Sequence, residues 1–187
     1  MPIGINGSGT VTGISVGGLP DGIVDADMLA TKTFTSYAVI ADQKSGSTDG
    51  GAFNNGEWRT RDLNTEISDA DNIVSISTNQ FTLQAGSYLI EATAPACQTG
   101  GHQCRLYNVT DAATVQIGSA EFARAGAHSQ TVSFVSARVT ISGAKAFEIQ
   151  HRCATSRASY GFGVGTSGAV NWGEGTVFCQ VKIYKEA

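Results

Sequence analysis

Short runs in which apolar and polar residues alternate are the sequence feature that most constrains the fold of this chain. From residue 34 onward these runs are separated by clusters of Gly, Asn, Asp and Ser. Side chains of a β-strand alternate between its two faces, so each run predicts a strand with one buried face. Nowhere do apolar residues recur at i, i+3, i+4 and i+7 over three turns, as an amphipathic helix requires. The sequence therefore predicts an all-β protein.

Four runs show the pattern most clearly, and each has one face that is mainly apolar. The residues predicted to share a face are Tyr37, Val39 and Ala41; Tyr88, Ile90 and Ala92; Phe147, Ile149, His151 and Cys153; and Val177, Cys179, Val181 and Ile183. A fifth run, residues 131–142, changes phase after Phe134. That change indicates either a β-bulge or a strand that is buried on both faces.

The number and spacing of the strands favour one sandwich over other all-β folds. Roughly eight to ten strands within about 150 residues match a β-sandwich or jelly roll better than a small barrel. The chain of 187 residues is long enough for one domain with a substantial core. We therefore predict a jelly-roll head over residues 34–187, preceded by an extended N-terminal arm over residues 1–33.

The arm carries scattered apolar residues among glycines and aspartates. It has too little apolar repetition to form a buried strand or helix, and too much for a purely solvated tail. We expect it to be ordered by docking on another protein; a frayed terminus without a role is the alternative. The predicted docking residues are Ile14, Leu19, Ile23, Met28 and Leu29.

Composition and charge argue against several classes of function. Charged residues make up 15% of the chain and the net charge is −4, which disfavours nucleic-acid binding through a basic face. No run approaches the roughly 18 apolar residues that a membrane span needs, and the start lacks the features of a secretory signal. We therefore expect neither membrane insertion nor secretion, and the four cysteines are expected to be free buried thiols.

The motifs that could carry chemistry are weak. His102 with Cys104, and His151 with Cys153, form H-x-C pairs, but on a strand the two groups lie roughly 7 Å apart, which does not suit a zinc knuckle. Core packing, or a place at a subunit interface, is the favoured role of His151. Residues 163–168 match G-x-G-x-x-G without a surrounding βαβ unit. We predict no enzymatic activity, no cofactor and no metal site.

An acidic turn near residue 70 offers oxygen ligands of the kind that calcium prefers. It contains Asp69 and Asp71, with Asp62 and Glu66 nearby in the sequence. The spacing is not that of an EF-hand, so a solvated turn is the favoured interpretation.

The long glycine-rich stretch from 156 to 175 is the predicted ligand surface. It combines Arg157 with three aromatic residues, Tyr160, Phe162 and Trp172. Aromatic rings beside polar groups suit the C–H faces of sugar rings, although the same residue types are also enriched where subunits pack together. Both interpretations are open at the level of sequence.

Residues 80–95 resemble a known family signature. Phe81, Leu83, Gly86 and Tyr88 resemble the strand-turn-strand signature of the tumour necrosis factor and complement globular-head superfamily. Residues 35–187 resemble the distal domains of bacteriophage tail fibres and tailspikes and the capsid decoration proteins of this superfamily. The resemblance implies a jelly roll of about ten strands that assembles as a tight homotrimer, with loops at the far end contacting a partner.

Two functions are compatible with this resemblance. The first is a trimeric capsid decoration (cement) protein on the virion surface, made in the host cytoplasm and attached through its arm to the major capsid protein or another virion protein. Weak recognition of a host cell-surface glycan would be an additional role. The alternative is the receptor-binding distal domain of a short tail fibre or tailspike. Because no shaft separates the arm from the head, we expect the decoration role; a non-phage adhesin is a third, less favoured interpretation.

Overall fold

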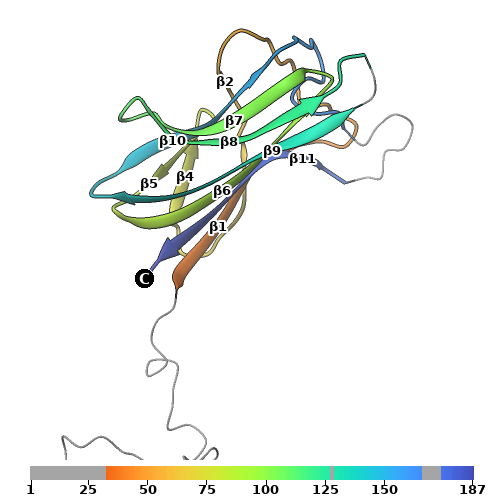
Figure 1. Ribbon diagram of the computed structural model, residues 1–187. Coiled ribbons are helices and arrows are strands. Elements are labelled where there is room, and N and C mark those ends of the chain that lie inside the picture. The colour runs from red at the N-terminus through yellow and green to blue at the C-terminus, as the bar shows by residue number, and fades with distance from the viewer. Residues whose placement is uncertain (1–32, 127–128, 166–173) are drawn as a thin grey trace, which may run out of the picture. The chain divides into compact units, whose positions relative to one another are not determined.

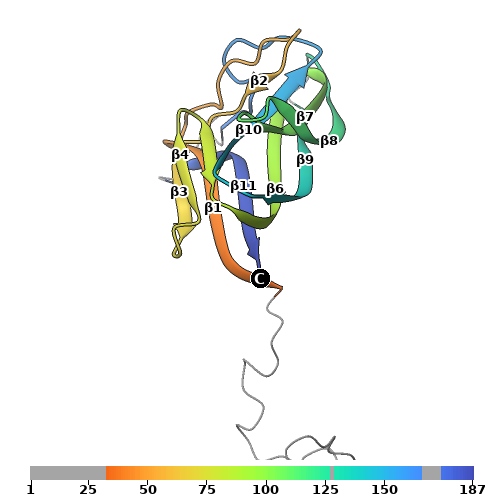
Figure 2. The same cartoon turned by 90° about the vertical axis from the view of Figure 1, so that its left-hand side faces the viewer.

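The computed structural model describes residues 33–126, 129–165 and 174–187, and it shows two antiparallel β-sheets packed face to face (Figures 1 and 2). Within these residues there are eleven strands and no helix. The prediction of an all-β jelly-roll sandwich is therefore confirmed.

The two sheets contain strands that are distant in sequence. Sheet I has the order β3 (Thr65–Asp69), β1 (Phe34–Lys44), β11 (Thr176–Glu186), β6 (Gly86–Cys97) and β9 (Gln130–Ile141). Sheet II has the order β4 (Val74–Ser77), β5 (Gln80–Leu83), β10 (Lys145–Cys153), β7 (Gly100–Asn108) and β8 (Ala113–Ala123), and β2 (Arg59–Thr60) also pairs with β10. Neighbouring strands that are not consecutive in the chain are the mark of a jelly roll.

The core lies between the two sheets and follows the predicted alternation in most strands. In β10, Phe147 and Ile149 are fully buried, and the ring of Phe147 stacks on Phe81 of β5 with centroids 5.7 Å apart. In β6, Tyr88 and Ile90 are also buried. The faces predicted for these two strands are confirmed, because burial of apolar area decides which face points inward.

Strand β1 differs from its prediction. Ala38 and Ile40 belong to the core cluster, whereas Tyr37 is 40% exposed on the other face. The sequence could not distinguish the faces because the run from Ala38 to Ala41 is apolar throughout. Val39 and Ala41 are buried as well, at 7% and 0% exposed, so this part of the strand is buried on both faces, which a two-residue period does not report.

Strand β9 resolves the phase change in the segment 131–142. It pairs with β6 from Gln130 to Ile141 without any register shift, so there is no bulge. Val135 and its successors on the same face point into the core, while Val132 and Phe134 point outward and are 45% and 43% exposed. Both earlier interpretations are therefore wrong, since the apolar residues before Val135 lie on the solvent side of a regular strand.

A second, smaller core lies under the loops at one end of the sandwich. It contains Phe53, Ala96, Cys153 and Phe162. The guanidinium group of Arg61 is fully buried beside it, 4.1 Å from the centroid of the Phe162 ring, and donates hydrogen bonds to the carbonyl oxygens of Pro95 (3.1 Å) and Phe162 (2.8 Å). Arg61 thus ties the loops to the sandwich.

The two ends of the described head lie side by side. Phe34, the first residue of β1, is the register partner of Glu186, the last residue of β11. The chain therefore enters and leaves the sandwich at the same end of sheet I.

Candidate assembly surface

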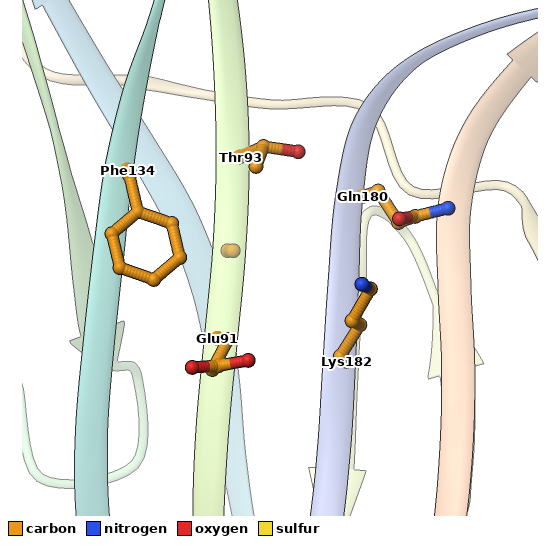
Figure 3. Close-up of a pocket in the computed structure, with 6 residues that line it drawn as sticks. Glu91, Thr93, Phe134, Gln180 and Lys182 are labelled. Carbon is orange, nitrogen blue, oxygen red and sulfur yellow. The ribbon is translucent and has the colours of Figure 1, made fainter.

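The outer face of sheet I presents a set of side chains that the core does not use. One cross-strand row contains Gln180, Thr93 and Phe134, and the next contains Lys182, Glu91 and Ser136. Glu91, Thr93, Phe134, Gln180 and Lys182 surround a shallow depression of about 70 Å³ across β9, β6 and β11 (Figure 3). We call this face, from β1 to β9, the sheet I surface.

The sheet I surface carries two apolar groups of side chains, one on β9 and one on β1 and β11. At the β9 edge, Val132 and Phe134 are exposed. Toward the β1 side, Tyr184 packs between two aromatic rings, with centroids 5.0 Å from Tyr37 and 5.1 Å from Phe34. Exposed apolar and aromatic groups that gather on one face of a soluble domain mark an interaction site.

The centre of the surface carries opposite charges. Lys182 and Glu91 are register partners on neighbouring strands, where directly opposed unlike charges stabilise a sheet. A typical protein interface has an apolar centre and a polar rim, so the two apolar groups of this surface, rather than its charged centre, have the composition of an interface core. The arrangement is therefore suited to binding another protein surface.

The predicted ligand loop is described only in part. Phe162 is 8% exposed and packs on Phe53 with ring centroids 4.4 Å apart, so it belongs to the small core rather than to an exposed platform. Arg157 Nε donates to the carbonyl oxygen of Gln98 (2.8 Å), and the Tyr160 hydroxyl donates to Gln98 Oε1 (3.1 Å). These bonds fix the loop locally, and its ligand-binding role stays a prediction.

Several predicted residues lie outside the described residues. They are Trp172 in the ligand loop and the five docking residues of the arm, Ile14, Leu19, Ile23, Met28 and Leu29. The docking role of the arm and its boundary at residue 33 also stay predictions.

The two histidines of the H-x-C pairs contact each other. His102 Nδ1 lies 2.9 Å from His151 Nε2, and His102 Nε2 lies 2.7 Å from Thr131 Oγ1. Burial lowers the pKa of His102 to about 4, and burial together with the nearby charge of Arg61 lowers the pKa of His151 well below its usual value. In the described part of the chain, no three His, Cys, Asp or Glu residues are placed to hold a metal ion.

In the acidic turn, the side chain of Asp69 binds backbone groups of the same turn. Both carboxylate oxygens of Asp69 accept backbone N–H groups, from Ile73 and Val74, at 2.9 Å each. Asp62 accepts a hydrogen bond from Lys44 Nζ at 2.8 Å. The carboxylates of Asp69 and Asp62 are therefore engaged by donors of the chain itself, as in a structural turn and an ion pair.

The alternation pattern did not predict the sheet I surface as a site. A signal for it is present in the sequence, because the phase change at Phe134 places two apolar residues on the wrong face for a core. Such a phase change is typical of an outward-facing apolar patch as well as of a bulge. The Lys182 and Glu91 pair gave no sequence signal, since 91 residue positions separate them.

Comparisons with solved structures identify the fold class. Eiger TNF from S. frugiperda has a TM-score of 0.52 and 11% identity, over 82% of this chain and 94% of its own. The expected jelly-roll fold is thereby confirmed, and it is similar to the fold of this TNF protein. At this level of identity the likeness shows the fold alone.

Two further matches have lower TM-scores. The globular domain of a zebrafish complement 1qA protein has a TM-score of 0.49 and 12% identity, over 81% of this chain and 95% of its own. Vertex protein P5 of PRD1 has a TM-score of 0.47 and 13% identity, over 82% of this chain and 99% of its own. No family model matches the chain, and no curated protein does.

No helix in the described part of the chain has the length and hydropathy to cross a membrane.

Proposed function

We propose that this protein is a homotrimeric structural protein of a bacteriophage virion, a capsid decoration protein whose subunits pack through the sheet I surface. The observation that carries the self-association is the exposure of Tyr37, Val132 and Phe134 on one face of a well-packed sandwich. The virion role is supported by the resemblance of residues 35–187 to distal domains of phage fibres and to decoration proteins. We assign no catalytic activity.

In the proposed trimer interface, two different patches of the sheet I surface contact each other across neighbouring subunits. In a ring with threefold symmetry, each subunit contacts its neighbour with two different patches. The β9 edge, with Val132 and Phe134, and the aromatic group of Tyr37, Tyr184 and Phe34 supply two such patches. Burying them removes apolar area from water, at about 25 cal/mol per Å².

Attachment to the virion would use residues 1–33 of each subunit. Three arms on one trimer would bind together, so modest single contacts give firm attachment through effective concentration. The major capsid protein or another virion protein is the proposed partner, at a site of threefold symmetry on the virion surface. The alternative role, the receptor-binding tip of a short tail fibre, uses the same trimer and differs in where it is attached.

The trimer is tested by native mass spectrometry of the full chain with a matched pair of variants. Phe134→Glu places a charge on the sheet I surface, whereas Ile117→Glu places it on β8 of sheet II, at a side chain that is 50% exposed. We expect wild type and Ile117→Glu to be trimers and Phe134→Glu to dissociate. A monomeric wild type, or a trimeric Phe134→Glu, would contradict the proposed interface.

The virion role is tested by immunogold electron microscopy of intact particles with antibody against residues 35–187. Label over the head supports decoration, label on the tail supports the fibre tip, and absence of label from particles contradicts both. Deletion of residues 1–30 should leave the trimer intact and abolish incorporation into virions. Normal incorporation of the truncated chain would refute the docking role of the arm.

A further inference from the structure

The outer face of sheet II brings together residues that are far apart in sequence. The guanidinium groups of Arg105 on β7 and Arg152 on β10 lie over the ring of Trp58, 4.2 and 4.7 Å from its centroid. Arg105 also lies 4.7 Å from the centroid of the Tyr107 ring. Trp58 directly precedes β2, which pairs with β10 at His151 and Gln150. We call these four residues, Trp58, Arg105, Tyr107 and Arg152, the arginine platform.

The two positive charges of the platform have no acidic partner of their own. Within the described residues, neither Arg105 nor Arg152 forms an ion pair, whereas the neighbouring Arg59 is paired with Glu57 at 3.3 Å. Their hydrogen-bond partners are neutral: Arg105 donates to Gln150 and Thr114, and Arg152 donates to Gln103.

Glu148, whose charge acts on Arg105, is held by an amide. Glu148 is buried and accepts a hydrogen bond from Gln150 Nε2. Burial lowers the pKa of Arg105, and the like charge of Arg152 acts in the same direction. The two guanidinium groups lie over the same Trp58 ring, in a protein whose net charge is negative. Such a pair is stabilised when an anion binds to it.

A depression adjoins the platform. It has a volume of about 350 Å³, and the residues that line it include Gly101, Gln103, Ala120, Arg152 and Ala154. A Cβ atom added at Gly101 would meet nothing within 4 Å, so the space above this glycine is open. Phe122, the register partner of Gly101, is 67% exposed. The volume lies at the lower end of the range for small-molecule sites, about 300–1,000 Å³.

We propose that the arginine platform and the adjoining depression form a binding site for an acidic saccharide, in which the carboxylate of a sugar residue binds Arg152 and Arg105. The planar guanidinium group matches a carboxylate with two parallel hydrogen bonds. Gln103 offers an amide for sugar hydroxyl groups, and the exposed ring of Phe122 offers aromatic surface for the apolar face of a sugar. This site shares no residue with the loop 156–175, and it does not depend on the virion role.

The surroundings favour a saccharide over a macromolecular polyanion. Nucleic-acid binding uses many phosphate contacts spread over a basic surface, whereas the platform has two arginines on a chain of net charge −4. The depression is small and lies on the opposite sheet from the sheet I surface, so it stays open if sheet I is buried between subunits. One or two sugar residues of a longer glycan fit these dimensions.

The proposal is tested by isothermal titration of the full chain with four probes. 3′-Sialyllactose and trigalacturonate carry carboxylates, lactose is the neutral core of the first, and inorganic phosphate is an anion without a sugar. We expect at least one acidic saccharide to bind. The affinity for lactose and for phosphate should be at least roughly tenfold lower, because lactose lacks the charge-assisted bidentate contact and phosphate lacks the sugar.

Three variants locate the site. Arg152→Gln should weaken binding roughly tenfold, and Gly101→Leu should abolish it by filling the depression while leaving the thermal melting temperature unchanged. Arg124→Gln, an exposed arginine in the turn after β8, is the control for net charge and should bind like wild type.

Each contrary result overturns the proposal. Binding of neither acidic probe, equal binding of lactose, or equal binding of phosphate refutes an acidic-saccharide site. Wild-type affinity in both Arg152→Gln and Gly101→Leu would place any binding elsewhere. A poly-glutamate peptide is titrated as a fifth probe, and tighter binding of this peptide than of either acidic saccharide would assign the platform to a protein partner. None of these results bears on the trimer, which is measured separately.

Discussion

The buried pair of His102 and His151 predicts a loss of stability in mild acid. Both imidazoles are neutral in the folded state because burial lowers the pKa of each. Among the residues that the structure describes, none is a hydrogen-bond partner of His151 Nδ1, so a proton added there would be a buried charge beside Arg61. In the unfolded chain both histidines regain a pKa near 6.5 and bind protons.

The sign and size of the effect follow from these values. Below pH 6.5 the unfolded state binds protons that the folded state does not, so the free energy of unfolding falls as the pH falls. For His102, a pKa lowered from 6.5 to about 4 corresponds to a loss of about 3 kcal/mol, complete near pH 4. With His151 titrating in the same way, the slope between pH 6 and 4.5 should approach about 2.7 kcal/mol per pH unit.

The assay is urea unfolding at fixed protein concentration from pH 7.5 to 4.5, followed by tryptophan fluorescence. His102→Gln should reduce the slope by about half, because one of two titrating groups is removed. Thr131→Val is the matched control: it removes the hydrogen bond to His102 Nε2 but keeps both imidazoles, so stability falls and the slope persists. A stability that is flat from pH 7 to 4.5, or an unchanged slope in His102→Gln, would refute the reasoning.

Three further predictions concern the interior. Arg61→Ala should lower the free energy of unfolding by about 3 kcal/mol in urea, because it leaves a cavity and two buried carbonyl groups without donors; a loss below about 1 kcal/mol would contradict this. Gly118→Ala should lower the free energy of unfolding by about 1–3 kcal/mol, because the added Cβ would lie 2.6 Å from the backbone oxygen of Phe134. Gly143→Ala is the control and should leave stability unchanged, because a Cβ there meets nothing within 4 Å. Equal melting temperatures of the two variants would contradict this prediction. The four buried thiols should resist iodoacetamide until urea is added, since burial raises the pKa of Cys179 to about 12; rapid labelling of native protein, measured by mass spectrometry, would count against their burial.

The fold was predictable from sequence because apolar residues clearly follow the two-residue period of β-strands, whereas the helical pattern is not sustained over three turns anywhere in the chain. Alternation in β10 separates Phe147 and Ile149 from Glu148 and Gln150, and burial then fixes the inward face. The same reasoning failed in β1, where Ala38 to Ala41 are apolar on both faces. Alternation identifies a face only where the two faces differ in polarity.

The candidate sites were harder to predict than the strands. The arginine platform joins Trp58, Arg105 and Arg152 from three segments, and nothing in their local sequences links them. The order of strands in sheet II makes β7 and β10 neighbours, and β2 then brings Trp58 beside them. The sequence pattern offered Phe162 as a surface aromatic instead, but Arg61 and Phe53 enclose that ring in the small core.

The side-by-side ends of the head determine how it bears mechanical force. Hydrogen bonds in an antiparallel sheet run perpendicular to the strands. A force that pulls the first residue of β1 away from the last residue of β11 would separate Phe34 from Glu186 first, and it would then break the hydrogen bonds between the two strands one at a time. A pull on the N-terminal end against the opposite end of the sandwich would load the bonds of β1 to both β11 and β3 together, in shear. A head tethered only by its N-terminal end is therefore held in its mechanically stronger direction.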